Sequence, residues 1–417
     1  MKISIFILYV CSFIFIYNVP FTGSPLSGSK LMIIFMAAWL IIRSRKIVFT
    51  KNLIKIVAWM IVLLFYSLAN VFLQRTGDFA LVYAEILFIL NHILGCVLLV
   101  NLFQTMGKSQ VKDILHMLVV ISFVQSIIII LSMLISPFNA FISRIAFIEG
   151  RDNLQLRYGF ARGYGLAASV TYDLAVCQAF AIMFIPYLIQ KTKNSRMKMF
   201  YILSSFPILF SILTLGRTGL IGVGLALIYI FRESIKMRSK LIKNLLYIIG
   251  LFMIISIVFL INTDSALISS MKTYVFEGFD TLFTTGKFQT HTWTNLMNMW
   301  NKIYDFSLKT WIVGDARYTD GARYYMRTDI GVMRDILYFG IIGCVLLVVE
   351  YLVIYKTIKN NAPDRQFVFM IQLIFIFLMV AHFKGEFLLA CGTGICMVLV
   401  IALVQHSIKN REGYGKD

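Results

Sequence analysis

The chain has few charged side chains and few residues that break helices. Charged residues make up 14% of the 417 positions, and there are only 6 prolines and 6 cysteines. A soluble domain would carry roughly 25% charged residues, so the shortage argues against an ordinary water-soluble fold. All the cysteines fall inside apolar runs, and we therefore expect neither a disulfide nor a metal site built from spaced cysteines.

Three motifs of nucleotide and metal chemistry are also missing. No loop ends in Gly-Lys-Ser/Thr, no Asp-x-Asp pair is present, and there is no His-Glu-x-x-His. These motifs cradle ATP phosphates, hold a metal-bound nucleotide sugar and bind zinc, respectively. Their absence argues against ATP-driven work, and we expect neither a cofactor nor a metal.

What the chain does contain is long apolar sequence. Hydrophobic residues make up 59% and the mean hydropathy is +0.82. Runs of about 17 to 25 apolar residues match the length that a helix needs to cross a bilayer. The sequence predicts one all-α integral membrane domain over residues 1–417, a polytopic bundle of about twelve transmembrane helices. The expected helices cover 3–20, 30–43, 53–73, 80–102, 114–136, 167–189, 199–215, 219–231, 244–262, 335–355, 367–383 and 387–406.

The net charge of +19 could suggest a nucleic-acid partner, but its distribution indicates membrane topology instead. Basic residues gather in every second link, for example 43–46, 191–198 and 232–243, and in the C-terminal tail. Such links mark the cytoplasmic side of a membrane protein. We expect a multi-pass protein of the cytoplasmic membrane, with both termini cytoplasmic, lipid around it and no nucleic acid bound.

Two links on the opposite, outward side are expected to be long, at about 137–166 and about 263–334. The first contains Arg151, Arg157, Arg162 and Tyr164 among glycines. The guanidinium fork suits phosphate and carboxylate groups, and glycine lets the backbone approach a ligand. These residues predict an anion site, and a solvated loop that meets lipid head groups is the alternative.

Arg217 lies in the outward hairpin between Leu215 and Gly219. An arginine held close to the membrane surface is costly unless it is paired with an anion. We therefore predict a functional role for Arg217. The alternative is an arginine that only snorkels to the interface.

The second long link holds a dense cluster of charged and tyrosine side chains. We predict that it forms a second cationic site with an acid, Asp329 or Asp320, poised to accept a proton. A self-paired surface network is the alternative. Lys384 and Glu386 could complete the same site, and Asp173 could pair with an arginine of the adjacent loop. The expected substrate-binding residues of this region are Arg317, Arg323, Tyr324, Arg327, Arg334 and Lys384.

Three stretches resemble the bacterial O-antigen polymerase (Wzy) family, and the resemblance extends to the overall plan from the first helix to the last. The plan shared with that family is many helices, cytoplasmic ends and two major outward loops rich in arginine. The stretches are Arg162-Gly163-Tyr164-Gly165, Gly216-Arg217-Thr218-Gly219, and Thr328-Asp329-Ile330-Gly331 running on to Phe339-Gly340-Ile341-Ile342-Gly343.

The resemblance implies a metal-independent glycosyltransferase of the bacterial inner membrane that acts in its periplasmic loops. The donor would be a glycan on undecaprenyl pyrophosphate, the acceptor a lipid-linked repeat unit, and a chain-length regulator protein a possible partner. Arg217 and the loop arginines would hold pyrophosphate and stabilise the leaving charge. Asp329, or else His291, would be the general base.

Two alternatives remain open. The related O-antigen ligases share the plan and carry a His-Asn pair where this chain has Thr328-Asp329, which favours polymerase, whereas His291 keeps ligase open. A flippase or transporter for the same lipid-linked sugar would also suit twelve helices. It should, however, place its charges along a path at mid-membrane and often shows internal repeats.

Overall fold

The computed structural model describes residues 5–43, 47, 51–108, 110–147, 165–169, 171–237, 277, 281–284, 286, 290–321 and 323–413. Helices make up nearly all of this part. In the first half they are α1 (Ile5–Ile16), α2 (Gly28–Ile42), α3 (Lys51–Gln74), α4 (Ala80–Leu87), the π-helix η1 (Phe88–Ile93), α5 (Leu94–Thr105), α6 (Val111–Leu134) and α7 (Ser136–Ile145).

The second half continues the same pattern. Its elements are α9 (Thr171–Lys191), α10 (Ser195–Leu215), α11 (Thr218–Met237), α14 (His291–Trp300), the 3₁₀ helix η3 (Asn301–Asp305), α15 (Leu308–Val313), the hairpin β1 (Thr319–Asp320) and β2 (Arg323–Tyr324), η4 (Tyr325–Arg327), α16 (Gly331–Asn360), α17 (Arg365–Lys384) and α18 (Gly392–Gly413). Side-chain caps start several of these helices. Asn194, Thr290, Ser307 and Asp364 accept hydrogen bonds from the first turns of α10, α14, α15 and α17.

Eight helical stretches in the described residues are long and apolar enough to cross a membrane. They are α3, α4 through α5, α6, α9, α10, α11, α16 and α17, whereas α1, α2 and the apolar part of α18 are shorter. Large apolar side chains such as Phe65 and Phe72 on α3 are exposed at the periphery. The fold is therefore that of an all-α, multi-pass membrane protein.

Eleven of the expected helix ranges fall on helices of the structure, and the twelfth, 244–262, lies outside the described residues. The differences arise from backbone geometry that apolar composition does not reveal. The first helix ends before 20, since Asn18 has a positive φ of 47°. The last begins at Gly392 rather than at 387, because residues 386–391 form an irregular turn.

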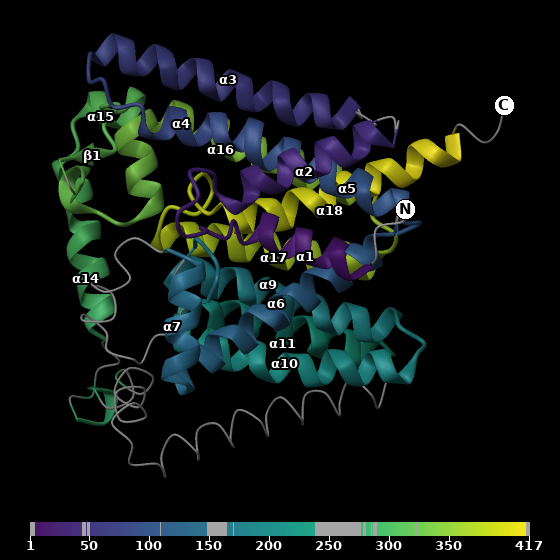
Figure 1. Cartoon of the computed structure of the whole chain (residues 1–417). Coiled ribbons are helices and arrows are strands. Elements are labelled where there is room, and N and C mark those ends of the chain that lie inside the picture. Colours follow the sequence, from purple (N-terminus) through teal and green to yellow (C-terminus); the bar gives the residue numbers. More distant parts are fainter. Residues whose placement is uncertain are drawn as a thin grey trace.

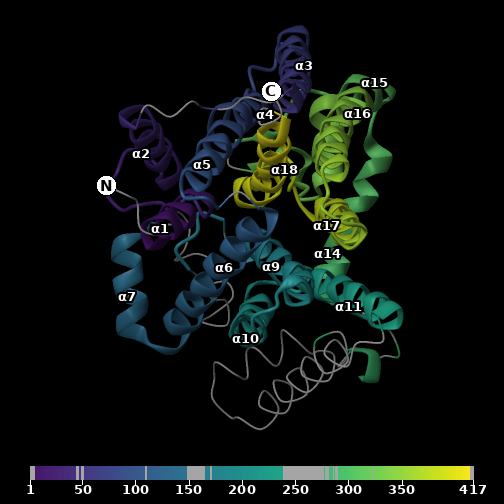
Figure 2. The same ribbon diagram turned by 90° about the vertical axis from the view of Figure 1, so that its right-hand side faces the viewer.

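The two links expected to be long contain helices of their own. The helix α7 occupies Ser136–Ile145, at the start of the first, and α14 and α15 lie in the second. In Figure 1, α14, α15 and β1 gather at one end of the long helices, and α18 ends toward the other. Figure 2 looks along the bundle and shows α9 surrounded by α6, α10, α11 and α17.

Helix α16 is broken near its beginning. Gly340 has φ +65°, and a Cβ there would lie 2.3 Å from the Ile312 carbonyl oxygen. The break leaves carbonyl groups without helical partners, and other elements satisfy them. The Asn70 side chain donates to the carbonyls of Val313 and Tyr338 at 2.7 and 2.8 Å, and the Tyr66 hydroxyl donates to the Phe339 carbonyl at 2.6 Å. α3, α15 and α16 are thus locked together.

Candidate functional site

Ionisable side chains converge where several helix ends meet on the side of α14 and α15. α9, α11 and α16 begin there, and α17 ends there. The side chains are Asp173, Arg217, Arg334, Asp335, His382, Lys384 and Glu386. We call this group the polar end cluster, and we build it up contact by contact.

Arg334 is the buried cation of the polar end cluster, with 6% of the residue exposed. Its guanidinium carbon lies 3.9 Å from the Tyr318 ring centroid and 3.6 Å from that of Tyr324. Cation–π contacts of this kind hold a guanidinium in place without using its N–H donors. Nε and Nη2 of Arg334 have no hydrogen-bond partner among the described residues. Arg334 is therefore positioned and keeps donors free for an anion.

A short hairpin places the two tyrosines over Arg334. Thr319 pairs with Tyr324, and the Tyr325 amide donates to the Tyr318 carbonyl at 3.0 Å, so that the two rings lie 5.9 Å apart. Asp78, between α3 and α4, anchors the hairpin. Its carboxylate accepts from the amides of Tyr318 and Thr319 at 2.7 and 2.9 Å. The Arg334 environment thus depends on a residue more than 200 positions away in the sequence.

Asp335, His382 and Glu386 form a buried triad beside Arg334. His382 Nε2 lies 3.0 Å from Asp335 Oδ2, and His382 Nδ1 lies 3.9 Å from Glu386 Oε1. The Phe387 amide donates to His382 Nδ1 at 3.4 Å, which makes Nε2–H the donor to Asp335. One carboxylate oxygen each of Asp335 and Glu386 has no hydrogen-bond partner in the described part of the chain. The triad can therefore take up a proton and hold it between two carboxylates.

The electrostatics of the triad favour a bound proton. Burial raises the pKa of the Glu386 carboxyl, and Asp335 raises it further, against the opposite effects of His382 and Arg334. Burial, helped by Glu386, also raises the pKa of the Tyr318 hydroxyl, so that it remains protonated. The ligand-type atoms of the triad lie within 4.8 Å of one another. An imidazole and two carboxylates are also a donor set that suits a divalent transition metal.

Lys384 and Tyr172 connect Arg334 to the start of α11. Lys384 Nζ donates to Thr218 Oγ1 at 2.5 Å and lies 5.5 Å from the Tyr172 ring centroid. The Tyr172 hydroxyl donates to the Ala381 carbonyl at 2.7 Å, and the neighbouring Asp173 interacts electrostatically with Arg334. Thr171, directly before them, has a strained φ of 50°. β-branched residues adopt this conformation rarely, and such strain concentrates at functional sites.

Arg217 stands at the start of α11, beside Thr218. Its guanidinium forms an ion pair with Glu277, and the His291 amide donates to the same carboxylate at 2.6 Å. Burial raises the pKa of Glu277, but the hydrogen bonds from Arg217 and His291 outweigh it and the net pKa is lowered. Two of the three residues predicted to be catalytic, Arg217 and His291, thus share one carboxylate.

The other predicted residues divide into three groups. Arg334 and Lys384 belong to the polar end cluster, and Tyr324 covers it. Asp329, Arg317, Arg323 and Arg327 are exposed on the segment that carries the hairpin. The predicted first-loop site, Arg151, Arg157, Arg162 and Tyr164, lies outside the described residues.

Asp335, His382, Tyr318 and Asp78 were not singled out from the sequence. Asp335 and His382 stand at the ends of apolar runs, where an ionisable residue also occurs as an ordinary interfacial group. A signal was nevertheless present in Ala381-His382-Phe383-Lys384-Gly385-Glu386, which places three ionisable groups within five residues at a helix end. The arginines of the adjacent loop that Asp173 was expected to pair with lie outside the described residues, and the cation that acts on Asp173 electrostatically is Arg334 of α16.

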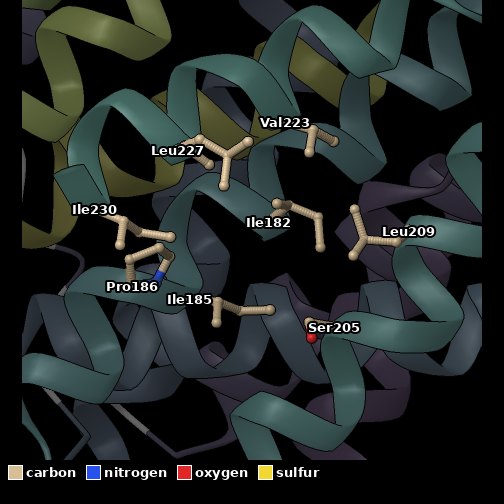
Figure 3. Close-up of a pocket in the computed structure, with 9 residues that line it drawn as sticks. Ile182, Ile185, Pro186, Ser205, Leu209, Val223, Leu227 and Ile230 are labelled. Atoms are coloured by element: carbon tan, nitrogen blue, oxygen red, sulfur yellow. The ribbon is translucent and has the colours of Figure 1, made fainter. Parts of the chain in front are cut away.

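An apolar crevice lies inside the bundle between α9, α10 and α11 (Figure 3). Ile182 and Pro186 of α9, Leu209 of α10, and Val223 and Leu227 of α11 line it. From Arg217 to Val223 is six residues, or roughly 9 Å along a helix. A cationic end and an apolar crevice therefore lie along the same pair of helices.

The fold and the polar end cluster define a multi-pass membrane protein with a buried ionisable site at one end of its bundle. No protein-family profile, curated protein or solved structure matches this chain. The function is therefore argued from the residues themselves.

Proposed function

We propose that this chain is a polysaccharide polymerase of the O-antigen type, a glycosyltransferase that joins lipid-pyrophosphate-linked oligosaccharide repeat units. The observation that carries the proposal is the meeting of Arg217, Arg334 and Lys384 from three helix ends, with an apolar crevice farther along α9 and α11. A lipid-linked pyrophosphate has the complementary shape, an anionic group attached to a long apolar chain. Arginine is well suited to the anionic part because its fork binds phosphate oxygens in pairs.

In the proposed reaction, a sugar hydroxyl of the acceptor attacks the anomeric carbon of the donor. A new carbon–oxygen bond forms, and the bond from the anomeric carbon to the lipid pyrophosphate breaks, with its electron pair leaving on the pyrophosphate. Arg334 and Arg217 stabilise the charge that develops on the leaving group. The hydroxyl proton passes to the triad of Asp335, His382 and Glu386, where two carboxylates stabilise the imidazolium.

Asp329 and His291 remain the proton acceptors predicted from the sequence. Both are exposed, and the His291 ring nitrogen Nε2 lies 3.0 Å from the Asn295 side-chain nitrogen. His382 suits the role better because Asp335 fixes its ring at 3.0 Å. Comparing Asp329→Asn and His291→Gln with His382→Gln assigns the base, since only loss of the true base should lower the rate at saturating donor and acceptor.

The test is the length of surface glycan on gels from cells that lack this protein and are rescued with variants at matched expression. Loss of the protein should leave core plus a single repeat unit, and the wild type should restore the ladder. Arg334→Gln and Arg217→Ala should each lower the rate by about two to three orders of magnitude. Arg196→Gln, an exposed arginine at the other end of α10, is the matched control and should restore a normal ladder.

If cells lacking the protein carry no surface repeat unit at all, the block lies in export or ligation and the polymerase proposal falls. Flippase activity then becomes the explanation when lipid-linked repeats accumulate on the inner leaflet, and ligase activity when completed chains accumulate on the lipid carrier.

Metal removal gives a separate prediction, because in the proposed reaction guanidinium groups stabilise the leaving pyrophosphate, a role that a metal ion has in other enzymes. Polymerisation in membrane vesicles should continue in excess EDTA at the untreated rate. Loss of activity in EDTA and its recovery with added zinc or manganese would instead assign a metal to Asp335, His382 and Glu386.

A further inference from the structure

A second cavity, of about 720 Å³, lies at the opposite end of the bundle from the polar end cluster. It opens where α1 begins, where α5 is linked to α6 and where α9 is linked to α10. α9 begins at the polar end cluster and ends at this cavity 21 residues later, or roughly 30 Å along a helix. The two sites are therefore separate.

Lysines dominate the wall of this cavity. Lys108 lies 3.7 Å from Asp113, and Lys191 lies 3.0 Å from Asp364, so these two are balanced by carboxylates. Lys112 and Lys193 also line the cavity, and neither forms an ion pair within the described residues. The cavity consequently holds positive charge that the described part of the protein does not neutralise.

Polar groups behind the lysines make the cavity more than a patch of surface charge. The Tyr201 hydroxyl lies 3.1 Å from His116 Nδ1, and both side chains line the wall. Thr192 is only 4% exposed, and its hydroxyl lines the cavity beside the Tyr201 hydroxyl, without a hydrogen bond of ordinary length in the described residues. A buried unpaired hydroxyl costs about 1 to 3 kcal/mol, a cost that a ligand oxygen would remove.

We propose that this cavity binds a phosphate group, with Lys112 and Lys193 as its charge partners and Thr192 as a hydrogen-bond donor. Lys112 and Lys193 line one concave site that also holds a buried hydroxyl, rather than separate points on the surface. The volume lies in the range of small-ligand sites. The phosphate can belong to a lipid head group or to a soluble phosphate compound, since both present the same oxygens at this end of the bundle.

The experiment uses the full chain, purified and placed in phosphatidylcholine nanodiscs. Sodium pyrophosphate binding is measured by titration calorimetry. In a parallel arm, nanodiscs also contain phosphatidylglycerol, and native mass spectrometry measures how much of it stays bound to the protein. The variants are Lys112→Gln/Lys193→Gln, its charge-retaining partner Lys112→Arg/Lys193→Arg, and the matched control Lys356→Gln/Lys359→Gln, which removes two exposed lysines of α16 that do not line the cavity.

The glutamine pair should weaken binding by about tenfold or more, and the arginine pair and the control should not. If the glutamine pair loses pyrophosphate binding, the proposal is supported and the ligand is a soluble phosphate compound. If the glutamine pair loses only the retained phosphatidylglycerol, the proposal is supported and the ligand is a lipid head group. The Arg217→Ala variant should keep the part of the binding signal that the glutamine pair loses, which separates this cavity from the polar end cluster. Binding that is equal in the glutamine pair and the control, with all thermal midpoints alike, would overturn the proposal.

Discussion

At the residue scale, aromatic rings and a shared carboxylate position the arginine side chains of the polar end cluster. Arg334 rests on Tyr318 and Tyr324, and Arg217 shares Glu277 with the amide of His291. Each arrangement leaves a planar guanidinium in a defined orientation. Because lysine cannot stack or bind in the same forked way, the two arginines should not tolerate exchange for lysine.

Arg334→Lys is therefore expected to lower the rate of glycan extension almost as much as Arg334→Gln does, although it keeps the positive charge. Donor turnover should fall by at least about tenfold, because the ammonium group loses the ring contacts and the paired donors. Initial rates of glycan extension in membrane vesicles measure this. A rate in Arg334→Lys equal to the wild type would show that charge alone matters at this position.

The Arg217–Glu277 pair predicts a pH dependence at the acidic end. The pKa of Glu277 is lowered in the folded state, so its stabilising contribution is present above the unfolded pKa and is lost as the pH falls through the folded pKa. Glu277→Gln should therefore lower the apparent thermal midpoint at pH 7, and the difference from the wild type should shrink below about pH 4. Thermal scans of both proteins in detergent at several pH values measure it. A difference that stays constant with pH would show that the pair does not contribute through charge.

At the element scale, the break in α16 sets the position of the polar end cluster. Gly340 separates the short N-terminal part of the helix, which carries Arg334 and Asp335, from the longer membrane-spanning part. The Asp315 amide donates to the Leu337 carbonyl at 2.6 Å, and Tyr66 and Asn70 satisfy the next carbonyls. The break therefore has its own supporting hydrogen bonds, and the short N-terminal part places Asp335 against His382 of α17 and Arg334 against the hairpin tyrosines.

Gly340→Ala should be strongly destabilising, because Gly340 has φ +65° and a Cβ would meet backbone atoms of Ile312 and Val313 within 2.5 Å. A cost of about 1 to 3 kcal/mol is expected from the strained backbone alone. The apparent thermal midpoint of the purified protein measures it.

Gly224→Ala in α11 is the matched control for this change. Nothing lies within 4 Å of the Cβ that it would add, and its φ is not positive, so alanine should be neutral or stabilising by up to about 1 kcal/mol. Equal midpoints for the two variants would show that the break at Gly340 is not required.

At the scale of the whole molecule, the bundle has two chemically different ends. One carries α14, α15, the hairpin and the polar end cluster, and the other carries the lysine-lined cavity (Figure 1). The alternation of basic links predicts that the second end faces the cytoplasm. In that orientation a substrate would meet the polar end cluster from the outer side of the membrane.

A membrane-impermeant maleimide should therefore label Lys309→Cys in α15 when only the outer barrier of the cell has been permeabilised. It should label Arg196→Cys only after the inner membrane is broken as well. Both positions are exposed. Five of the six native cysteines are buried and Cys344 is half-buried, so the unmodified protein gives the background. Labelling in the reverse order would invert the proposed topology.

The sequence by itself determined the class of protein and most of its helices. Long apolar runs and a shortage of charge require helices in a bilayer, because the backbone must satisfy its own hydrogen bonds there. Periodicity and length are local properties, and eleven expected ranges fall on helices. Arg217, Arg334 and Lys384 were also predicted as site residues, since each is a cation at the end of an apolar run.

Only the tertiary structure decided which of these groups meet. The contacts of Asp78 with Tyr318 and of His382 with Asp335 join residues that are far apart in the chain. Such pairings depend on how helices cross and on where α16 breaks, and no local pattern encodes either. The physical reason is that hydrophobicity requires each helix to be buried or to face lipid, whereas close packing between particular side chains selects its neighbours.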